Sequence, residues 1–312
     1  GRSSHGRTRR NLSIIVMLTP ASLGLAVFFI YPLIANLYFS LTSYNLLSSP
    51  VWIGLRNYEF LFTKDPLVVT AALNTLWFVV ILVPVRIVCA LCVAGLLVRA
   101  KHASGLWRTL FYLPALVPPV ASVVAFVFLF NPATGPINAI LKLVGVDGPL
   151  WFSDPAWSKP SLLLLGVWVM GDILIIFLAS LLDVPKELLE AAELDGANGP
   201  RRVRHVTLPH IVPVLIFAVV TGVISALQYF TEAAVASSVA SGKSGTNQNM
   251  NSILGYPNNS LLTYTQLLYV RGFGNFQLGY AAALAVVLFL VTAIFLGLML
   301  RRFKAFTPEG TS

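Results

Sequence analysis

Charged side chains are scarce in this chain. Asp, Glu, Lys and Arg make up 11% of its 312 residues, against about a quarter in an ordinary soluble domain. Hydrophobic residues make up 57% of the chain, and the mean hydropathy is +0.80. A single soluble core has no room for that much apolar surface, so the composition excludes an ordinary soluble domain and indicates a membrane protein.

Cysteine and histidine are also rare, with two and four residues. Cys89 and Cys92 lie three residues apart inside one apolar run, and two thiols are too few ligands for a metal site. We expect them to be small packing residues, which excludes a disulfide framework. The histidines lack metal-ligand spacing, and no Ser, His and acid arrangement is visible. The sequence therefore predicts no enzyme, no metal site and no cofactor bound to this chain.

Long apolar runs are what the sequence has in abundance. A helix needs about 20 apolar residues to cross a hydrocarbon layer of about 30 Å. Six runs reach that length, at residues 13–38, 70–98, 109–130, 161–182, 211–230 and 279–300. The first run is too long for the core of a signal peptide and has no cleavage site, so we expect a retained span. The sequence therefore predicts an all-α polytopic membrane protein with six spans.

Basic residues gather on one side of these spans, and short cytoplasmic loops are rich in Lys and Arg. Fourteen of them fall in the segments 1–12, 99–108, 185–209 and 301–304. Six fall in the connections on the opposite side, which join the first run to the second, the third to the fourth and the fifth to the sixth. Both termini are therefore expected in the cytoplasm. The net charge of +9 reflects this asymmetry, so it supports a membrane topology and not nucleic-acid binding.

One short stretch resembles a nucleotide-binding loop. Residues 241–244, SGKS, end like the motif GxxxxGK[ST], but Ser237 stands where the first glycine belongs, and no strand is predicted before it. We therefore expect any ATP that drives this protein to bind another subunit.

The segment 185–209 is a charged interruption between the fourth and fifth runs. Pro185 suits the first turn of a helix, Glu187 and Glu190 suit the positive end of its dipole, and Gly196 can end it in a left-handed conformation. The pattern predicts a helix of about 11 residues, too short to be stable alone in water. Its alanines give it a small, approachable surface. It is therefore either a docking element for a partner or a solvated connector.

The same segment resembles the EAA motif of permeases in binding-protein-dependent ABC importers. That motif, EAA-x3-G-x9-I-x-LP, is matched from Glu190 to Pro209, with Val206 in place of Ile. The sequence DGA at 195–197 also matches the sugar-transporting branch. The resemblance implies a coupling helix that sits in a cleft of a cytoplasmic ATPase, with contacts from Glu190, Ala191, Ala192, Asp195, Gly196, Ala197, Leu208 and Pro209.

The resemblance extends along most of the chain, toward the maltose- and glycerol-phosphate-type permeases. It is carried by GLxNY at 54–58, FYLP at 111–114, NP at 131–132 and GYAAA at 279–283. It implies a type I ABC importer permease fold in the bacterial cytoplasmic (inner) membrane. It also implies a second permease subunit, two ATPase subunits that bind ATP and Mg, and an external solute-binding protein.

Residues 231–260 depart from the family pattern. They are longer than the compact turn that often follows the fifth span, and they are rich in Ser, Gly and Asn, which favours a loop. Since the charge count places this segment outside, it either contacts the binding protein or the solute mouth, or it is a solvated loop without a special role.

Polar and aromatic residues within or next to the runs are candidates for the solute path, because an ionisable side chain facing lipid is costly. They are Arg86, Trp168, Asp172, Gln228, Tyr229, Phe230 and Glu232. Alternatively, Arg86 and Asp172 form a buried pair, Arg86 snorkels to the interface, or Trp168 is a packing aromatic. On one continuous helix Gln228 and Tyr229 point about 100° apart, so at most one of them is expected to face the path.

Together these expectations describe a permease subunit that moves a sugar, preferably a neutral mono- or oligosaccharide, by alternating access. A glycerol-phosphate or other phosphorylated polyol is the alternative within the class, and it needs several basic groups where the spans offer only Arg86. A six-span channel or receptor without an ATPase is the alternative from another class. The predicted domains are a cytoplasmic tail (1–12), a first span with its external loop (13–69), a transporter domain (70–301) with a coupling segment (185–209) and an external loop (231–278), and a cytoplasmic tail (302–312).

Overall fold

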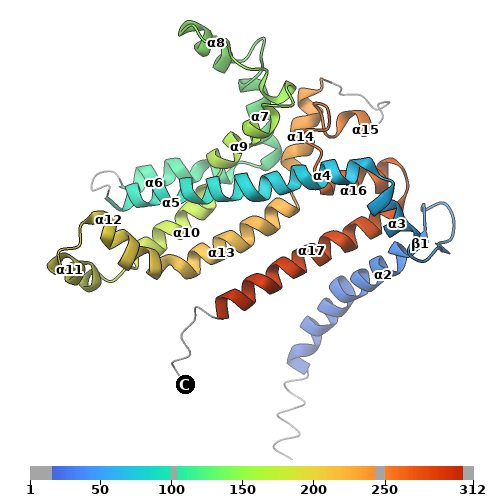
Figure 1. The fold of residues 1–312 in the computed structure, drawn as a ribbon, viewed down its shortest axis with the longest axis horizontal. Helices are drawn as coiled ribbons and strands as arrows, with labels where there is room; N and C mark the ends of the chain where they lie inside the picture. Colours follow the sequence, from blue (N-terminus) through green and yellow to red (C-terminus); the bar gives the residue numbers. More distant parts are fainter. Residues whose placement is uncertain (1–15, 100–103, 243–249, 305–312) are drawn as a thin grey trace, which may run out of the picture. The chain divides into compact units, whose positions relative to one another are not determined.

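The computed structural model describes residues 16–99, 104–242 and 250–304. The predicted tail at 1–12 lies outside these residues, and so do Lys243 and Ser244 of the SGKS stretch and positions 305–312. The described chain is almost wholly helical, as predicted (Figure 1). It divides into two units, one of residues 16–65 with 271–291 and the other of residues 66–270 with 292–304.

The first unit begins with one helical run from Val16 to Ser40, which includes η1 (Ala26–Ile30) and α2 (Tyr31–Ser40). A short antiparallel hairpin of β1 (Thr42–Ser43) and β2 (Val51–Trp52) leads to α3 (Arg56–Thr63). The side-chain amide of Asn57 fastens α3 to the hairpin, because it donates to the carbonyl oxygens of Ser40 and Thr42, both at 2.9 Å. The first half of α17 (Leu278–Lys304) completes this unit.

The second unit contains the remaining helices. In chain order they are α4 (Pro66–Trp77), η2 (Phe78–Leu82), α5 (Val83–Arg99), α6 (Ser104–Tyr112), η3 (Leu113–Leu116), α7 (Pro119–Leu129), α8 (Pro136–Leu143), η4 (Trp151–Ser153), α9 (Ser158–Trp168), α10 (Gly171–Leu182), α11 (Lys186–Leu194), α12 (Gly199–Arg202), η5 (Val203–Thr207), α13 (Leu208–Leu227), α14 (Thr231–Ala240), α15 (Met250–Ile253) and α16 (Tyr264–Tyr269), after which η6 (Val270–Gly274) leads out of the unit.

Four helical runs are long and apolar enough to cross a membrane, namely Val16–Ser40, Pro66–Arg99, Gly199–Leu227 and Leu278–Met299. They cover the predicted first, second, fifth and sixth spans. The two remaining predicted spans, 109–130 and 161–182, are each a pair of helices with a bend, of 97° in the first pair and 46° in the second. The described residues therefore hold four continuous spans, or six if each bent pair is one span.

Three π-helical turns end two residues before a proline. η1 precedes Pro32, η2 precedes Pro84 and η5 precedes Pro209. In an α-helix proline leaves one hydrogen bond unmade and its ring clashes with the carbonyl four residues earlier. The wider π turn relieves that clash where it occurs, so the runs that contain these prolines continue as single helices.

The core of the second unit lies where α5 packs against α10 and where α7 packs against α14. Phe78 and Phe177 are fully buried in it. The outward face of α4 instead carries Val69, Leu73 and Leu76, each more than half exposed. Rows of exposed aliphatic side chains of this kind suit lipid as the surrounding solvent.

The expected loop at 231–260 is partly helical, which corrects the prediction. α14 occupies Thr231–Ala240 and packs against α7, with Ala233, Ala236 and Ser237 buried. The hydroxyl of Ser237 also donates to the carbonyl of Tyr256 at 3.2 Å. The segment is helical because its small buried residues, mainly alanines, let α14 and α7 approach closely.

Candidate functional site

Three interruptions in the helices of the second unit meet around one cavity. The cavity is lined at or beside each break: by Ala115, Val117 and Pro119 where η3 meets α7, by Val169 and Asp172 where α9 meets α10, and by Tyr229 and Glu232 where α13 meets α14. The cavity encloses about 230 Å³. Irregular backbone at membrane depth is tolerated where it lines such a cavity, so the arrangement is typical of a solute path.

At the first two interruptions the sequence carries residues that suit a break. At the α7 break the consecutive Pro118 and Pro119 end the preceding helical turn and start the next one, because neither has an N–H to donate. At the α10 break Gly171 lies so close to α6 that an added Cβ would be 2.7 Å from the carbonyl oxygen of Phe111. Only glycine permits that approach, which positions the first turn of α10, including Asp172, beside the cavity.

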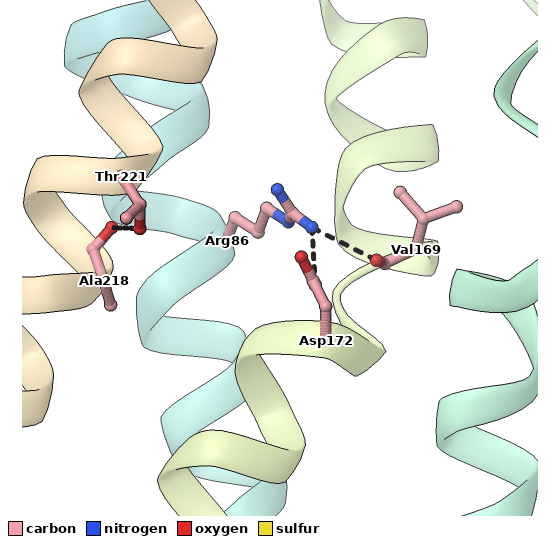
Figure 2. A network of polar contacts seen from close by, with 5 residues as sticks. All are labelled: Arg86, Val169, Asp172, Ala218 and Thr221. Atoms are coloured by element: carbon pink, nitrogen blue, oxygen red, sulfur yellow. Dashed lines mark hydrogen bonds and ion pairs between the residues drawn. The ribbon is translucent and has the colours of Figure 1, made fainter. Parts of the chain in front are cut away.

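Arg86 projects from α5 into the α9–α10 break (Figure 2). Its Nη2 donates to Oδ1 of Asp172 at 2.7 Å and to the carbonyl oxygen of Val169 at 3.3 Å. Val169 follows the last residue of α9, so its carbonyl belongs to the negative end of that helix dipole. The guanidinium is therefore held by a carboxylate and by a helix end together.

This ion pair is only partly buried. The side chain of Arg86 is 23% exposed and that of Asp172 is 57% exposed, so the alternative of a buried, mutually neutralised pair does not describe it. The Nε of Arg86 has no hydrogen-bond partner among the described residues. That atom is buried, so the donor that Arg86 retains for a polar group inside the cavity is Nη1, which bonds to no residue that the structure describes.

A second cavity of about 310 Å³ shares Leu82, Arg86, Tyr229 and Glu232 with the first. All five residues from Gln228 to Glu232 line it. Both Gln228 and Tyr229 line this cavity, whereas the sequence predicted that at most one of them faces the path. The prediction assumed one continuous helix, but α13 ends at Leu227, before both residues. The break in the backbone therefore gathers both side chains on one wall.

The remaining aromatic candidates differ from each other in position. Phe230 lines the second cavity and lies against Tyr269, with ring centroids 5.3 Å apart. Trp168 lines neither cavity, and its ring packs against Phe126 at a centroid distance of 5.2 Å. Its position favours the packing role that the sequence left open.

Sequence reasoning missed Ser122, on the first turns of α7. Its side chain is buried, it lines the first cavity, and its Oγ has no hydrogen-bond partner within the described part of the chain. A buried hydroxyl without a partner is costly, so such a group is suited to a polar ligand. The signal that could have revealed it is the Pro118–Pro119 pair, which marks a break within an apolar run.

The segment 185–209 forms a second candidate site. α11 spans Lys186–Leu194, and none of its residues is buried, with Leu194 90% exposed. Gly196 has φ +75° and ends the helix as predicted, and the N–H groups of Gly196 and Ala197 donate to the carbonyls of Glu193 and Ala192 at 3.0 and 2.9 Å. A short helix with an exposed leucine at its end is a surface that a partner can cover.

The candidate coupling residues lie on or next to this helix. Glu190 and Ala191 are exposed and Ala192 is half-buried on α11, Asp195 and Ala197 flank its end, and Leu208 and Pro209 begin α13. An ion pair at 2.7 Å joins Glu193 on α11 to Arg202 on α12. The helix is thus tied to the chain that leads into the α13 span.

Within the described residues no group of three or more His, Cys, Asp or Glu is placed to hold a metal ion. Cys89 and Cys92 are free thiols on α5. The site therefore consists of polar and aromatic side chains around two adjoining cavities, together with a separate exposed helix.

Comparisons with known proteins agree with this geometry. Residues 86–304 match the family model described as the binding-protein-dependent transport system inner membrane component. The chain is 35% identical to the probable ABC transporter permease protein YesP of Bacillus subtilis over 94% of this chain and 91% of that protein. It is 31% identical to the arabinooligosaccharides transport system permease protein AraP of the same organism, over 93% and 88%.

The fold is shared with a solved structure. A chain of a bacterial ABC transporter involved in the import of the acidic polysaccharide alginate superposes with a TM-score of 0.79, at 20% identity, over 97% of this chain and 98% of that one. This confirms the predicted importer permease fold. The chain therefore belongs to the binding-protein-dependent transport system inner membrane component family, and it is a membrane transport subunit, not an enzyme.

Proposed function

We propose that this chain is a permease subunit of an ATP-driven importer that moves a neutral mono- or oligosaccharide into a bacterial cell. It lies in the cytoplasmic membrane with six spans, each bent pair counting as one, and with both termini in the cytoplasm. An external binding protein delivers the solute, and a second permease subunit completes the path. The observation that carries the proposal is the pair of cavities at the meeting point of three interrupted helices.

The groups around these cavities suit a sugar. Arg86, Ser122 and Gln228 provide hydrogen-bond donors, Asp172 and Glu232 provide carboxylate acceptors, and the nearby Tyr229 and Phe230 supply aromatic rings. Sugar hydroxyls pair with such donors and acceptors, and sugar C–H faces pack on aromatic rings. The name of the relative AraP, an arabinooligosaccharide permease, supports the same class of solute.

The charge of the lining favours a neutral solute over a phosphorylated polyol. Arg86 already pairs with Asp172, and Glu232 adds a further carboxylate. A phosphate group would need convergent basic side chains, and the described lining of the two cavities offers one arginine whose charge is shared.

Energy for transport comes from two cytoplasmic ATPase subunits that bind ATP and Mg, and α11 is their docking element. Glu190, Ala191, Ala192, Asp195, Gly196, Ala197, Leu208 and Pro209 carry the coupling. Because α11 is tied through the Glu193–Arg202 ion pair to the chain that enters α13, movement of α11 reaches the α13–α14 break at the cavity. The interrupted helices act as the hinges of alternating access.

Reconstitution of the complex with its ATPase subunits, partner permease and binding protein tests the proposal. Neutral mono- and oligosaccharides are expected to stimulate ATP hydrolysis and to be taken up into proteoliposomes only when ATP is present. Uptake without ATP, down a gradient, would identify a channel. Stimulation by glycerol phosphate and not by neutral sugars would identify the phosphorylated solute as the true one.

A further inference from the structure

A third cavity lies at the other end of the second unit, next to α11. It encloses about 330 Å³ and is formed by the last turns of α5, the end of α10, and the chain from α11 to the start of α13. Its walls are mainly aliphatic, with Leu91, Val98, Leu181 and Ile211 among them. None of the residues that line the first two cavities lines this one, so it is a separate site.

The charged residues in its lining are both arginines. Arg99 is the last residue of α5, is exposed, and makes no hydrogen bond or ion pair with any residue that the structure describes. Arg202 uses Nη1 to pair with Glu193 at 2.7 Å, and the other nitrogens of its guanidinium remain for a further acceptor. An aliphatic hollow with two guanidinium groups among its walls fits a molecule with an apolar chain and an anionic head.

The depth of the cavity decides which molecule that is. The apolar run Pro66–Arg99 ends at Arg99, so its guanidinium lies at the level where hydrocarbon gives way to headgroups, while Leu91 lies two turns deeper. A lipid phosphate belongs at the first level and an acyl chain at the second.

We infer that this cavity binds an anionic phospholipid of the cytoplasmic leaflet, with its phosphate at Arg99 and Arg202 and an acyl chain between α5, α10 and α13. The assignment to that leaflet rests on the proposed orientation of the chain. Three lining residues, Leu189, Gly199 and Arg202, belong to α11 and α12. A bound lipid therefore braces the docking helix against the spans, and the coupling between ATPase and permease depends on anionic lipid.

Two substitutions test the site, one at its apolar wall and one at its cationic end. Gly95 lines the cavity, and a Cβ added there meets nothing within 4 Å, so the side chain of Gly95→Leu starts in open space and is chosen to fill the hollow. Arg99→Gln removes the unpaired cation and leaves the Arg202–Glu193 pair intact. Gly297→Leu, on the exposed surface of α17 where an added Cβ also meets nothing, is the matched control.

Binding is measured by native mass spectrometry on the detergent-purified full chain, titrated with dioleoylphosphatidylglycerol or with dioleoylphosphatidylcholine. The unsubstituted chain and Gly297→Leu are expected to bind the anionic lipid at least about fivefold more tightly than the neutral one. Arg99→Gln is expected to lose that preference, and Gly95→Leu to lose binding of both lipids at this site. Equal affinity for the two lipids in the unsubstituted chain would overturn the inference.

Unchanged phosphatidylglycerol binding in both Gly95→Leu and Arg99→Gln would overturn it as well. If Gly95→Leu lowers the melting temperature of the chain, the test rests on Arg99→Gln and Gly297→Leu. The inference then stands only if Arg99→Gln loses the preference for phosphatidylglycerol and Gly297→Leu keeps it. The measurement needs neither ATP nor solute nor partner subunits. A chain that retains the lipid but supports no sugar-stimulated ATP hydrolysis therefore refutes the proposed function while the lipid site stands.

Discussion

The Nη2 atom of Arg86 lies 2.7 Å from Oδ1 of Asp172, and this contact joins the first turn of α5 to the first turn of α10 beside a cavity. Because Asp172 is more than half exposed, water screens the pair, and its contribution to the free energy of unfolding is expected to be about 1 kcal/mol or less. The pair is therefore placed to orient Arg86 toward the cavity and does little to hold the fold.

Neutralising either partner is expected to affect transport more than stability. Arg86→Gln and Asp172→Asn should each lower the rate of ATP-driven uptake by about tenfold, equivalent to about 1.4 kcal/mol, and the double variant should lose less than the sum. Uptake into proteoliposomes and melting temperature in detergent are the two measurements. Lys64→Gln, which breaks the exposed pair with Glu59, is the control and should change neither. Normal uptake in both single variants would remove the pair from the path.

Residue types and their spacing predicted the elements of this site, but not their assembly. The run lengths predict the long apolar helices, and Gly196 is the predicted end of a helix because a left-handed conformation there suits glycine. The sequence did not reveal that residues 228–230 leave the helix, because no proline or glycine marks that break. The contact between Gly171 and Phe111 joins positions 60 residues apart, and no local pattern reports such a packing constraint.

Gly196→Asp is expected to abolish ATP-driven uptake while membrane insertion stays normal. The structure narrows the cause: φ is +75°, a conformation that aspartate adopts more readily than most L-residues, and an added Cβ meets nothing within 4 Å. The effect should therefore come from the changed end of α11 and the added charge, not from a clash. Gly196→Asn is the matched variant, because asparagine tolerates this conformation and carries no charge.

ATPase-coupled uptake and the amount of protein in the membrane fraction are measured for both variants of Gly196. The asparagine variant should retain most of the uptake. If the aspartate variant transports normally, α11 is not the coupling helix.

Gln228→Ala is expected to weaken the apparent affinity for solute about fivefold and to leave the amount of folded protein unchanged. Gln228 is exposed and lines the second cavity, and a hydrogen bond to a neutral ligand group is typically worth about 1 kcal/mol. Gln277→Ala, at an exposed glutamine of the other unit, is the control. The measurement is the concentration of sugar that half-saturates uptake, and the same value in both variants and the unsubstituted chain would exclude Gln228 from the site.

The largest loss of stability is expected at Asp65, in the first unit. Its carboxylate accepts from Nη2 and Nε of Arg271 at 2.9 and 3.1 Å and from the hydroxyl of Tyr280 at 2.9 Å, and its side chain has no exposed surface. Asp65→Asn leaves the guanidinium of Arg271 facing an amide, without a counter-charge, in a mostly buried position. Breaking a buried pair in this way costs about 3–5 kcal/mol of unfolding free energy.

Glu59→Gln removes a carboxylate from the same helical region, but from a pair whose side chains are 60% and 61% exposed, so it should cost about 0–1 kcal/mol. Thermal unfolding of the two variants in the same detergent compares them directly. A melting temperature for Asp65→Asn that lies no lower than that of Glu59→Gln would contradict the assignment of Asp65 as the centre of a buried network. A large drop for Asp65→Asn alone would establish that this network holds α3 to the start of α17.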